Sequence, residues 1–139
     1  MPGMPSTSIS RLGHLTAAWG ALFAVVHVYW AAGGAAGMNG KPADALAAQL
    51  YIAFIAVLGL AGAAVAFGLA RGPHPALARL AQVGGAALLL GVAVGTGRWL
   101  AQWSLEGDGA AGVVTTLYFL FGGVMFLKLG RLTHSHMGI

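Results

Sequence analysis

The fold of this chain is decided by residues 46–70, which read LAAQLYIAFIAVLGLAGAAVAFGLA and contain no charged side chain. At ~1.5 Å of rise per residue, a helix of this length crosses the roughly 30 Å hydrocarbon core of a bilayer. Three similar apolar stretches occupy residues 12–32, 77–99 and 111–129. The sequence therefore predicts an all-α integral membrane protein, with four spanning helices that form a single four-helix bundle over residues 1–139.

The composition agrees with a membrane protein. The chain is 58% hydrophobic and only 7% charged, whereas soluble domains carry about 25% charged residues. It has no cysteine, which excludes disulfides, thiol nucleophiles and cysteine-ligated metals. The net charge of +4 is better explained by basic residues at one membrane face than by nucleic-acid binding.

The distribution of lysine and arginine predicts an orientation. One side of the predicted bundle carries Arg11, Arg71, Arg79, Lys128 and Arg131. The opposite side carries only two basic residues, Lys41 and Arg98, together with the three acidic residues of the chain, Asp44, Glu106 and Asp108. Because basic loops stay in the cytoplasm, we expect a multi-pass protein of the plasma (inner) membrane with both termini inside.

The first apolar stretch has an alternative interpretation. Arg11, the apolar run after it and the small residues 31–36 together resemble a secretory signal. Cleavage would leave three helices and place the new N-terminus outside. The run is longer than a usual signal core and contains His27, Tyr29 and Trp30, which favours a retained helix.

Glycine residues recur inside the predicted helices and indicate close helix packing. Gly84, Gly91 and Gly95 fall on one helical face of the third stretch, Gly59 and Gly62 lie in the second, and Gly122 lies in the fourth. Small residues allow membrane helices to approach closely. We expect these faces to point into the bundle; contact with a second copy or with a partner membrane protein is the alternative.

Polar and aromatic side chains gather near the predicted outer ends of the helices. We expect a polar and aromatic pocket there that opens outward. The candidate ligand-binding residues are His27, Tyr29, Trp30, Tyr51, Arg98, Trp99, Gln102, Trp103 and Tyr118. Aromatic side chains also collect at any membrane interface, so an ordinary aromatic belt is the alternative.

Helical spacing brings part of this set together. Spacings of three and four residues place Thr16, Gly20, Phe23, His27 and Trp30 on one face of the first helix. Arg98 and Gln102 share the glycine face of the third helix. If the first and third helices are neighbours, Arg98 points toward His27. An ionisable residue inside a membrane usually has a partner, and the candidate partners of Arg98 are Glu106, Asp108 and Asp44.

The segment around His27 resembles a known family. Residues 24–34 read AVVHVYWAAGG, which is similar to the first helix of a family of small bacterial four-helix membrane proteins of unknown function. Members of that family carry a His-x-Tyr-Trp element, here His27 to Trp30, followed by Gly-Gly, here Gly33-Gly34. The resemblance implies a four-helix membrane fold and supplies no activity.

Several function classes agree with these features. We expect a protein that binds a small molecule or a lipid headgroup, with an accessory subunit of a larger membrane complex as the alternative. A redox anchor that binds haem or quinone is a third hypothesis, in which His27 is the one histidine well inside the membrane. No set of nucleophile, base and orienting residue indicates an enzyme, and a transporter is disfavoured because few charges lie inside the predicted spans.

Overall fold

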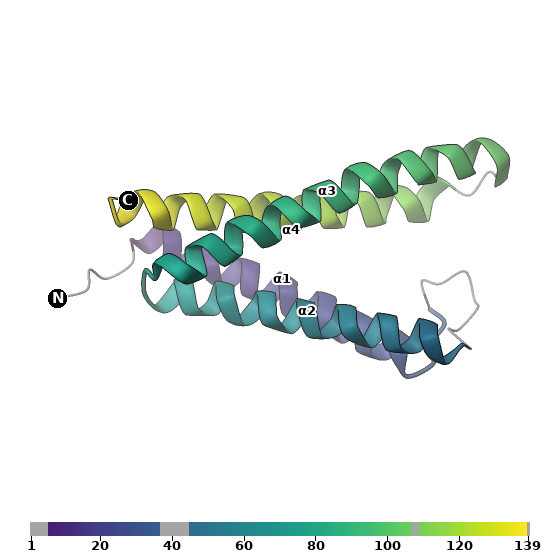
Figure 1. Cartoon of the computed structure of the whole chain (residues 1–139), viewed down its shortest axis with the longest axis horizontal. Helices are drawn as coiled ribbons and strands as arrows, with labels where there is room; N and C mark the ends of the chain where they lie inside the picture. Colours follow the sequence, from purple (N-terminus) through teal and green to yellow (C-terminus); the bar gives the residue numbers. More distant parts are fainter. Residues whose placement is uncertain (1–5, 37–44, 107–108, 139) are drawn as a thin grey trace.

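The chain folds into four long helices. The computed structural model describes residues 6–36, 45–106 and 109–138, with side-chain positions for all of these except 95–106, 109–112 and 115. The helices are α1 (Thr7–Ala31), α2 (Leu46–Arg71), α3 (Pro75–Glu106) and α4 (Gly109–His136). They run alternately up and down, so that α1 begins and α4 ends at the same end of the molecule (Figure 1). The predicted all-α fold with four helices is confirmed.

Three of the helices are long and apolar enough to cross a membrane. Among the described residues these spans are Thr7–Ala31, Leu46–Arg71 and Pro75–Val94. They coincide with three of the predicted stretches, and they indicate a multi-pass membrane protein. The fourth predicted stretch, residues 111–129, lies within α4.

Local sequence explains where the helices begin and end. The Ser6 hydroxyl accepts a hydrogen bond from the Ile9 amide at 3.4 Å and caps α1. Between α2 and α3 only residues 72–74 are non-helical, and Pro75 begins α3, where its missing N–H costs nothing. Such a short connection predicts that α2 and α3 are antiparallel neighbours. Leu77 confirms this, because its side chain reaches Gly68 of α2.

Glycines set the spacing of the two closest helix pairs. A Cβ atom built on Gly13 would lie 2.7 Å from Ala70 Cβ, which places α1 directly against α2. In the other pair, a Cβ atom on Gly85 would lie 2.7 Å from the Leu127 amide nitrogen of α4. The predicted packing role is confirmed for Gly59 and Gly62 of α2 and for Gly122 of α4, because side chains of α1 or α4 occupy the space beside each of them.

The predicted glycine face of α3 is wrong. A Cβ atom built on Gly84 or Gly91 meets no atom within 4 Å, so these two residues do not point into the bundle. The face that packs on α4 is carried by Gly85 instead, because successive residues of a helix point in directions about 100° apart. The third member of the predicted face, Gly95, lies outside the described side chains.

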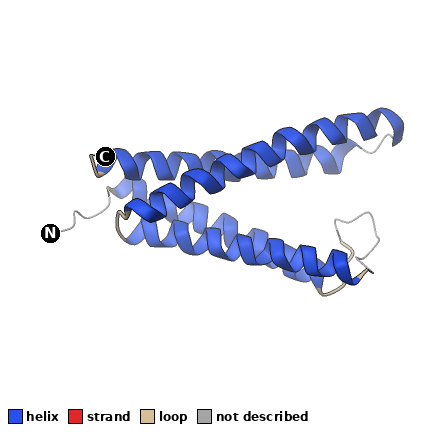
Figure 2. Ribbon diagram, viewed as in Figure 1, coloured by secondary structure: helices blue, strands red, loops and turns tan. Residues whose placement is uncertain are grey.

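The helices form two hairpins, α1–α2 and α3–α4, which diverge along the molecule. They lie close together at the end where α1 and α3 begin and α2 and α4 end, and they are far apart at the other, wide end (Figures 1 and 2). We call the first of these the basic end, because the helix ends there carry Arg11, Arg71, Arg79, Lys128 and Arg131. The core follows this shape. Its buried residues are Ile9, Trp19, Phe23, Ala66, Leu69, Ala78, Ala81, Phe126 and Leu129.

Two buried threonines show how the core accommodates polar groups. Thr16 and Thr133 are fully buried, and each hydroxyl donates to the carbonyl four residues earlier in its own helix, Leu12 and Leu129 respectively, at 2.8 Å. Both hydroxyls are therefore satisfied without a partner helix, as a non-aqueous interior requires.

Candidate functional site

A column of aromatic rings runs along α1 toward the wide end. Trp19 stacks on Phe23 with ring centroids 5.4 Å apart, Phe23 contacts the His27 ring at 4.0 Å, and His27 meets Trp30 edge-on at 4.9 Å. The spacing of four, four and three residues keeps these rings on one helical face. We call these four residues the aromatic column, and its arrangement confirms the predicted face of the first helix.

Helix α4 closes the inner part of this column. The Tyr118 ring stacks on Trp19 at 4.9 Å, and the Phe119 ring meets Phe23 edge-on at 5.4 Å. The Tyr118 hydroxyl also donates a hydrogen bond to the backbone carbonyl of Trp19 at 3.2 Å. These contacts hold the two hairpins together at mid-length.

We expect Tyr118→Phe to weaken the junction between the hairpins. The change removes one inter-helix hydrogen bond, which is worth roughly 0.5–1.5 kcal/mol, and leaves the ring stack in place. The free energy of unfolding is measured in mild detergent by titration with a denaturing detergent and circular dichroism. Tyr51→Phe is the matched control, because Tyr51 is exposed on α2. Equal stability of the two variants would show that the Tyr118 hydroxyl contributes nothing.

His27 presents one free ring nitrogen in the half of the aromatic column that is nearer the wide end. Its Nδ1 lies 2.8 Å from the Phe23 carbonyl oxygen, and because that oxygen only accepts, Nδ1 carries the hydrogen. Nε2 has no partner among the described residues, and the side chain is half-buried. His27 therefore offers Nε2 as a hydrogen-bond acceptor or a ligand atom beside two aromatic rings.

Trp19 supplies a second polar atom without a partner. Its side chain is 9% exposed, and its Nε1 is buried without an acceptor in the described structure. A buried donor left unpaired costs about 1–3 kcal/mol. Trp19 is absent from the predicted site, although its spacing of four residues from Phe23 and eight from His27 places it on the same helical face.

The side chains of Tyr29 and Trp30 make hydrogen bonds to the segment immediately after α1. The Trp30 indole donates to the Ala36 carbonyl at 2.7 Å, and the Ala36 amide donates to the Tyr29 hydroxyl at 3.4 Å. Gly33 turns the chain with φ +92°, a conformation that glycine adopts without strain. Their polar atoms thus fix a turn, while the Trp30 ring remains part of the aromatic column.

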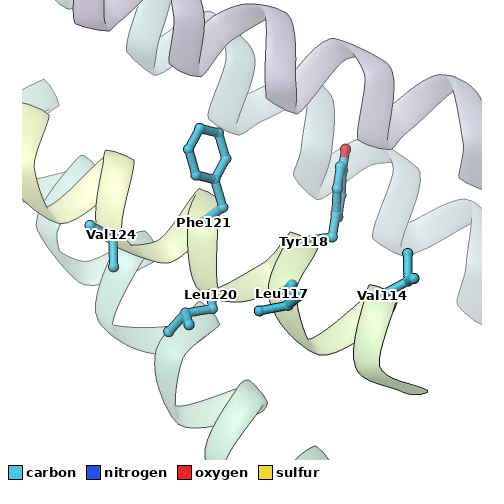
Figure 3. Close-up of a pocket in the computed structure, with 6 residues that line it drawn as sticks. All are labelled: Val114, Leu117, Tyr118, Leu120, Phe121 and Val124. Carbon is cyan, nitrogen blue, oxygen red and sulfur yellow. The ribbon is translucent and has the colours of Figure 1, made fainter. Parts of the chain in front are cut away.

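An apolar groove lies on the exposed side of α4 (Figure 3). It has a volume of about 660 Å³ and is lined by Val114, Leu117, Tyr118, Leu120, Phe121 and Val124. In Figure 3 the Tyr118 hydroxyl points toward α1, where it meets the Trp19 carbonyl. Tyr118 is the one predicted site residue among those that line this groove.

Helical register relates the groove to His27. Phe23 of α1 and Tyr118 of α4 are at the same level, since their rings stack at 6.2 Å. The two helices are antiparallel, so His27, four residues after Phe23, lies at the level of Val114, four residues before Tyr118. The polar end of the aromatic column and the outer part of the groove therefore lie at one depth, where the hairpins diverge.

The other predicted site residues are not brought to this position. Tyr51 is 66% exposed on α2. Four of the nine, namely Arg98, Trp99, Gln102 and Trp103, lie in α3, and their side chains are outside the described part. Within the described residues α1 contacts α2 and α4 but not α3. The prediction that Arg98 points toward His27 required the first and third helices to be neighbours, and in the described structure they are not.

Comparisons with known proteins add no assignment. No protein-family model, no curated protein and no solved structure matches this chain. The resemblance of the first helix to a family of small membrane proteins stays a prediction.

Proposed function

We propose that the protein is a four-span membrane protein that binds an amphipathic molecule from the bilayer. The apolar part of that molecule lies in the groove of α4, and its polar group is turned toward His27. The observation that carries this proposal is the groove of about 660 Å³ on α4, with its outer part at the depth of His27. Most of its lining side chains are exposed, so a ligand lying there would keep one side against the bilayer.

The lining of the groove favours a lipid-like ligand. Five of the six lining residues are aliphatic or phenylalanine, and the one hydroxyl, on Tyr118, is already bonded to α1. Such a surface holds an acyl or prenyl chain by dispersion contacts and gives a polar group no partner. The polar group must therefore be recognised at the rim, where His27 Nε2 is free.

The interior of the junction can also take part. Trp19 Nε1 is a buried donor that lacks an acceptor, and its ring stacks on Tyr118, which lines the groove. A carbonyl oxygen on a bound molecule would satisfy this donor only if the Trp19 ring turned toward the groove, because protein atoms cover the nitrogen. Quinones and lipid esters both carry that group, and of the cofactors considered above a quinone agrees better with the apolar groove than a haem.

The orientation and the fourth span are part of the same proposal. The predicted span at residues 111–129 lies in α4, which packs antiparallel to α3 over much of its length and exposes apolar side chains such as Val114 and Phe121. The close packing of α1 on α2 favours retention of the first helix, because its loss would uncover Gly59 and Ala66 of α2. The five basic residues at one end favour cytoplasmic termini.

We expect Val114→Trp to abolish binding of the native ligand, because the indole fills the outer part of the groove. Protein purified in mild detergent is analysed by native mass spectrometry, and the molecule released from it is identified by its mass. Val113→Trp is the matched control, since Val113 is also exposed but does not line the groove. We expect the bound fraction to fall at least about tenfold in V114W, equivalent to ~1.4 kcal/mol or more, and to be unchanged in V113W.

The same samples separate the alternatives. A visible spectrum distinguishes a haem from an uncoloured lipid. We expect His27→Phe to lower the fraction of protein that retains the ligand, while the new ring keeps the contact with Phe23. Equal occupancy in V114W, V113W and the unaltered protein contradicts the groove as the binding site. A stoichiometric protein subunit in place of a small molecule supports the accessory role, for which the open faces of Gly84 and Gly91 offer a packing surface.

A further inference from the structure

Among the described residues, the basic end carries positive charge without an acidic side chain beside it. Its five basic side chains, Arg11, Arg71, Arg79, Lys128 and Arg131, are all exposed. The one acidic residue in the described part, Glu106, ends α3 at the opposite end of that helix from Arg79; Asp44 and Asp108 lie outside the described residues. Nothing in the described part neutralises these charges, so the basic end can accept anionic groups from outside the chain.

One of these charges is held in a defined position. The Arg71 guanidinium carbon lies 5.3 Å from the centroid of the Phe67 ring, one turn earlier on α2, within the range of a cation–π contact. His14 of α1 meets the same ring edge-on, with centroids 5.8 Å apart. Phe67 thus forms a platform that carries a cation from α2 and an imidazole from α1.

The backbone under this platform is fixed. Gly13 and Ala70, the residues directly before His14 and Arg71, are in the closest contact of the α1–α2 pair, where a Cβ atom on Gly13 would lie 2.7 Å from Ala70 Cβ. His14 Nδ1 is bonded to the Ser10 carbonyl at 2.7 Å, which directs its other ring nitrogen away from the helix. The two groups are therefore held in place rather than free at the ends of flexible loops.

The surroundings identify the kind of anion. Phe67 is 45% exposed, and Leu60, two turns earlier on the same face of α2, is 53% exposed. Apolar side chains thus continue from the charged group along α2, which is long enough to span a bilayer. A free phosphate would use the charges alone, whereas a phospholipid would use the charges and the apolar surface together.

We propose that Arg71, Phe67 and His14 form a binding site for the headgroup of an anionic phospholipid in the leaflet at the basic end. The guanidinium forks onto the phosphate oxygens, the imidazole of His14 packs against the edge of the Phe67 platform, and the acyl chains lie along Leu60. The site is at the opposite end of α1 from His27, so it does not rest on the ligand proposed for the groove of α4.

Lipid titrations of the full chain test this site. The protein in mild detergent is titrated with phosphatidylglycerol or with phosphatidylcholine of the same acyl chains, and bound lipid is counted by native mass spectrometry. We expect a preference for phosphatidylglycerol that Arg71→Gln lowers by about fivefold, the factor expected for one basic residue near an anionic surface. Arg79→Gln is the control, because Arg79 is exposed at the same end but has no aromatic platform in the described structure.

Three outcomes would overturn the proposal. The first is equal binding of the two lipids by the unaltered protein. The second is an equal loss in R71Q and R79Q, which would indicate a diffuse effect of net charge. The third is competition by inorganic phosphate at the concentration of the lipid phosphate, which would indicate a site for a free anion. Thermal unfolding of both variants shows that each is folded, and Phe67→Leu, which removes the platform and keeps the charge, should lower the preference as well.

Discussion

Phe23→Ala is expected to lower the free energy of unfolding by roughly 3 kcal/mol, at the lower end of the range for a buried phenylalanine. Phe23 is 6% exposed and touches the rings of Trp19, His27, Tyr118 and Phe119. In a membrane the gain from leaving water is largely absent, so the loss comes from the missing contacts and the cavity. The measurement is denaturing-detergent unfolding followed by circular dichroism.

The neighbouring residue provides the control for this experiment. Leu22 is 57% exposed on the outer face of α1, and Leu22→Ala should change stability by no more than about 0.5 kcal/mol. If the two variants were equally stable, the aromatic column would not hold the hairpins together. Phe23→Ala should also weaken ligand retention, because the ring of His27 loses the surface against which it packs.

Gly85→Ala is expected to destabilise the α3–α4 pair by about 1–3 kcal/mol, the usual cost of overpacking a tight contact. The added Cβ would lie 2.7 Å from the Leu127 amide nitrogen and 2.8 Å from the Gly123 carbonyl oxygen. Both are backbone atoms of α4, which cannot rotate away as a side chain can. The two helices must therefore separate, and every contact along the hairpin weakens with them.

Gly84→Ala should raise the free energy of unfolding instead of lowering it. The Cβ at this position meets no atom within 4 Å, and alanine is favoured over glycine inside a helix by up to about 1 kcal/mol. The two variants add the same methyl group to adjacent residues of one helix, so their comparison isolates the packing of α3 on α4. Destabilisation of both to the same extent would contradict the assignment of Gly85 to the interface.

Part of the site could be predicted from spacing alone. The three- and four-residue intervals of Phe23, His27 and Trp30 place them on one face of α1, and the ring contacts confirm it. The same reasoning failed for α3, where Gly84 and Gly91 share a face that turns out to be open. Spacing identifies residues that face the same way, and it does not say which way that face is turned.

The groove on α4 could not be predicted from residue type. Val114, Leu117 and Phe121 are the side chains expected on any helix that faces lipid, and nothing in their order distinguishes a groove from a flat surface. The predicted pocket was chosen for polar residues, because these are rare in a membrane and so stand out. A binding surface for a hydrophobic molecule has no such signature.

The sequence by itself determined the class of the protein. Long apolar stretches separated by a few charges leave the helix as the way to satisfy the backbone in lipid, and the alternation of those stretches places the basic residues at one end. Tertiary structure alone decided which helices are neighbours: α1 packs on α2 and α4, α3 packs on α2 and α4, and the two hairpins diverge toward the wide end. The physical reason is that helix pairing in a membrane depends on close contact between particular small and aromatic residues, such as Gly85 on Leu127 and Trp19 on Gly122, and hydrophobicity is the same on every face.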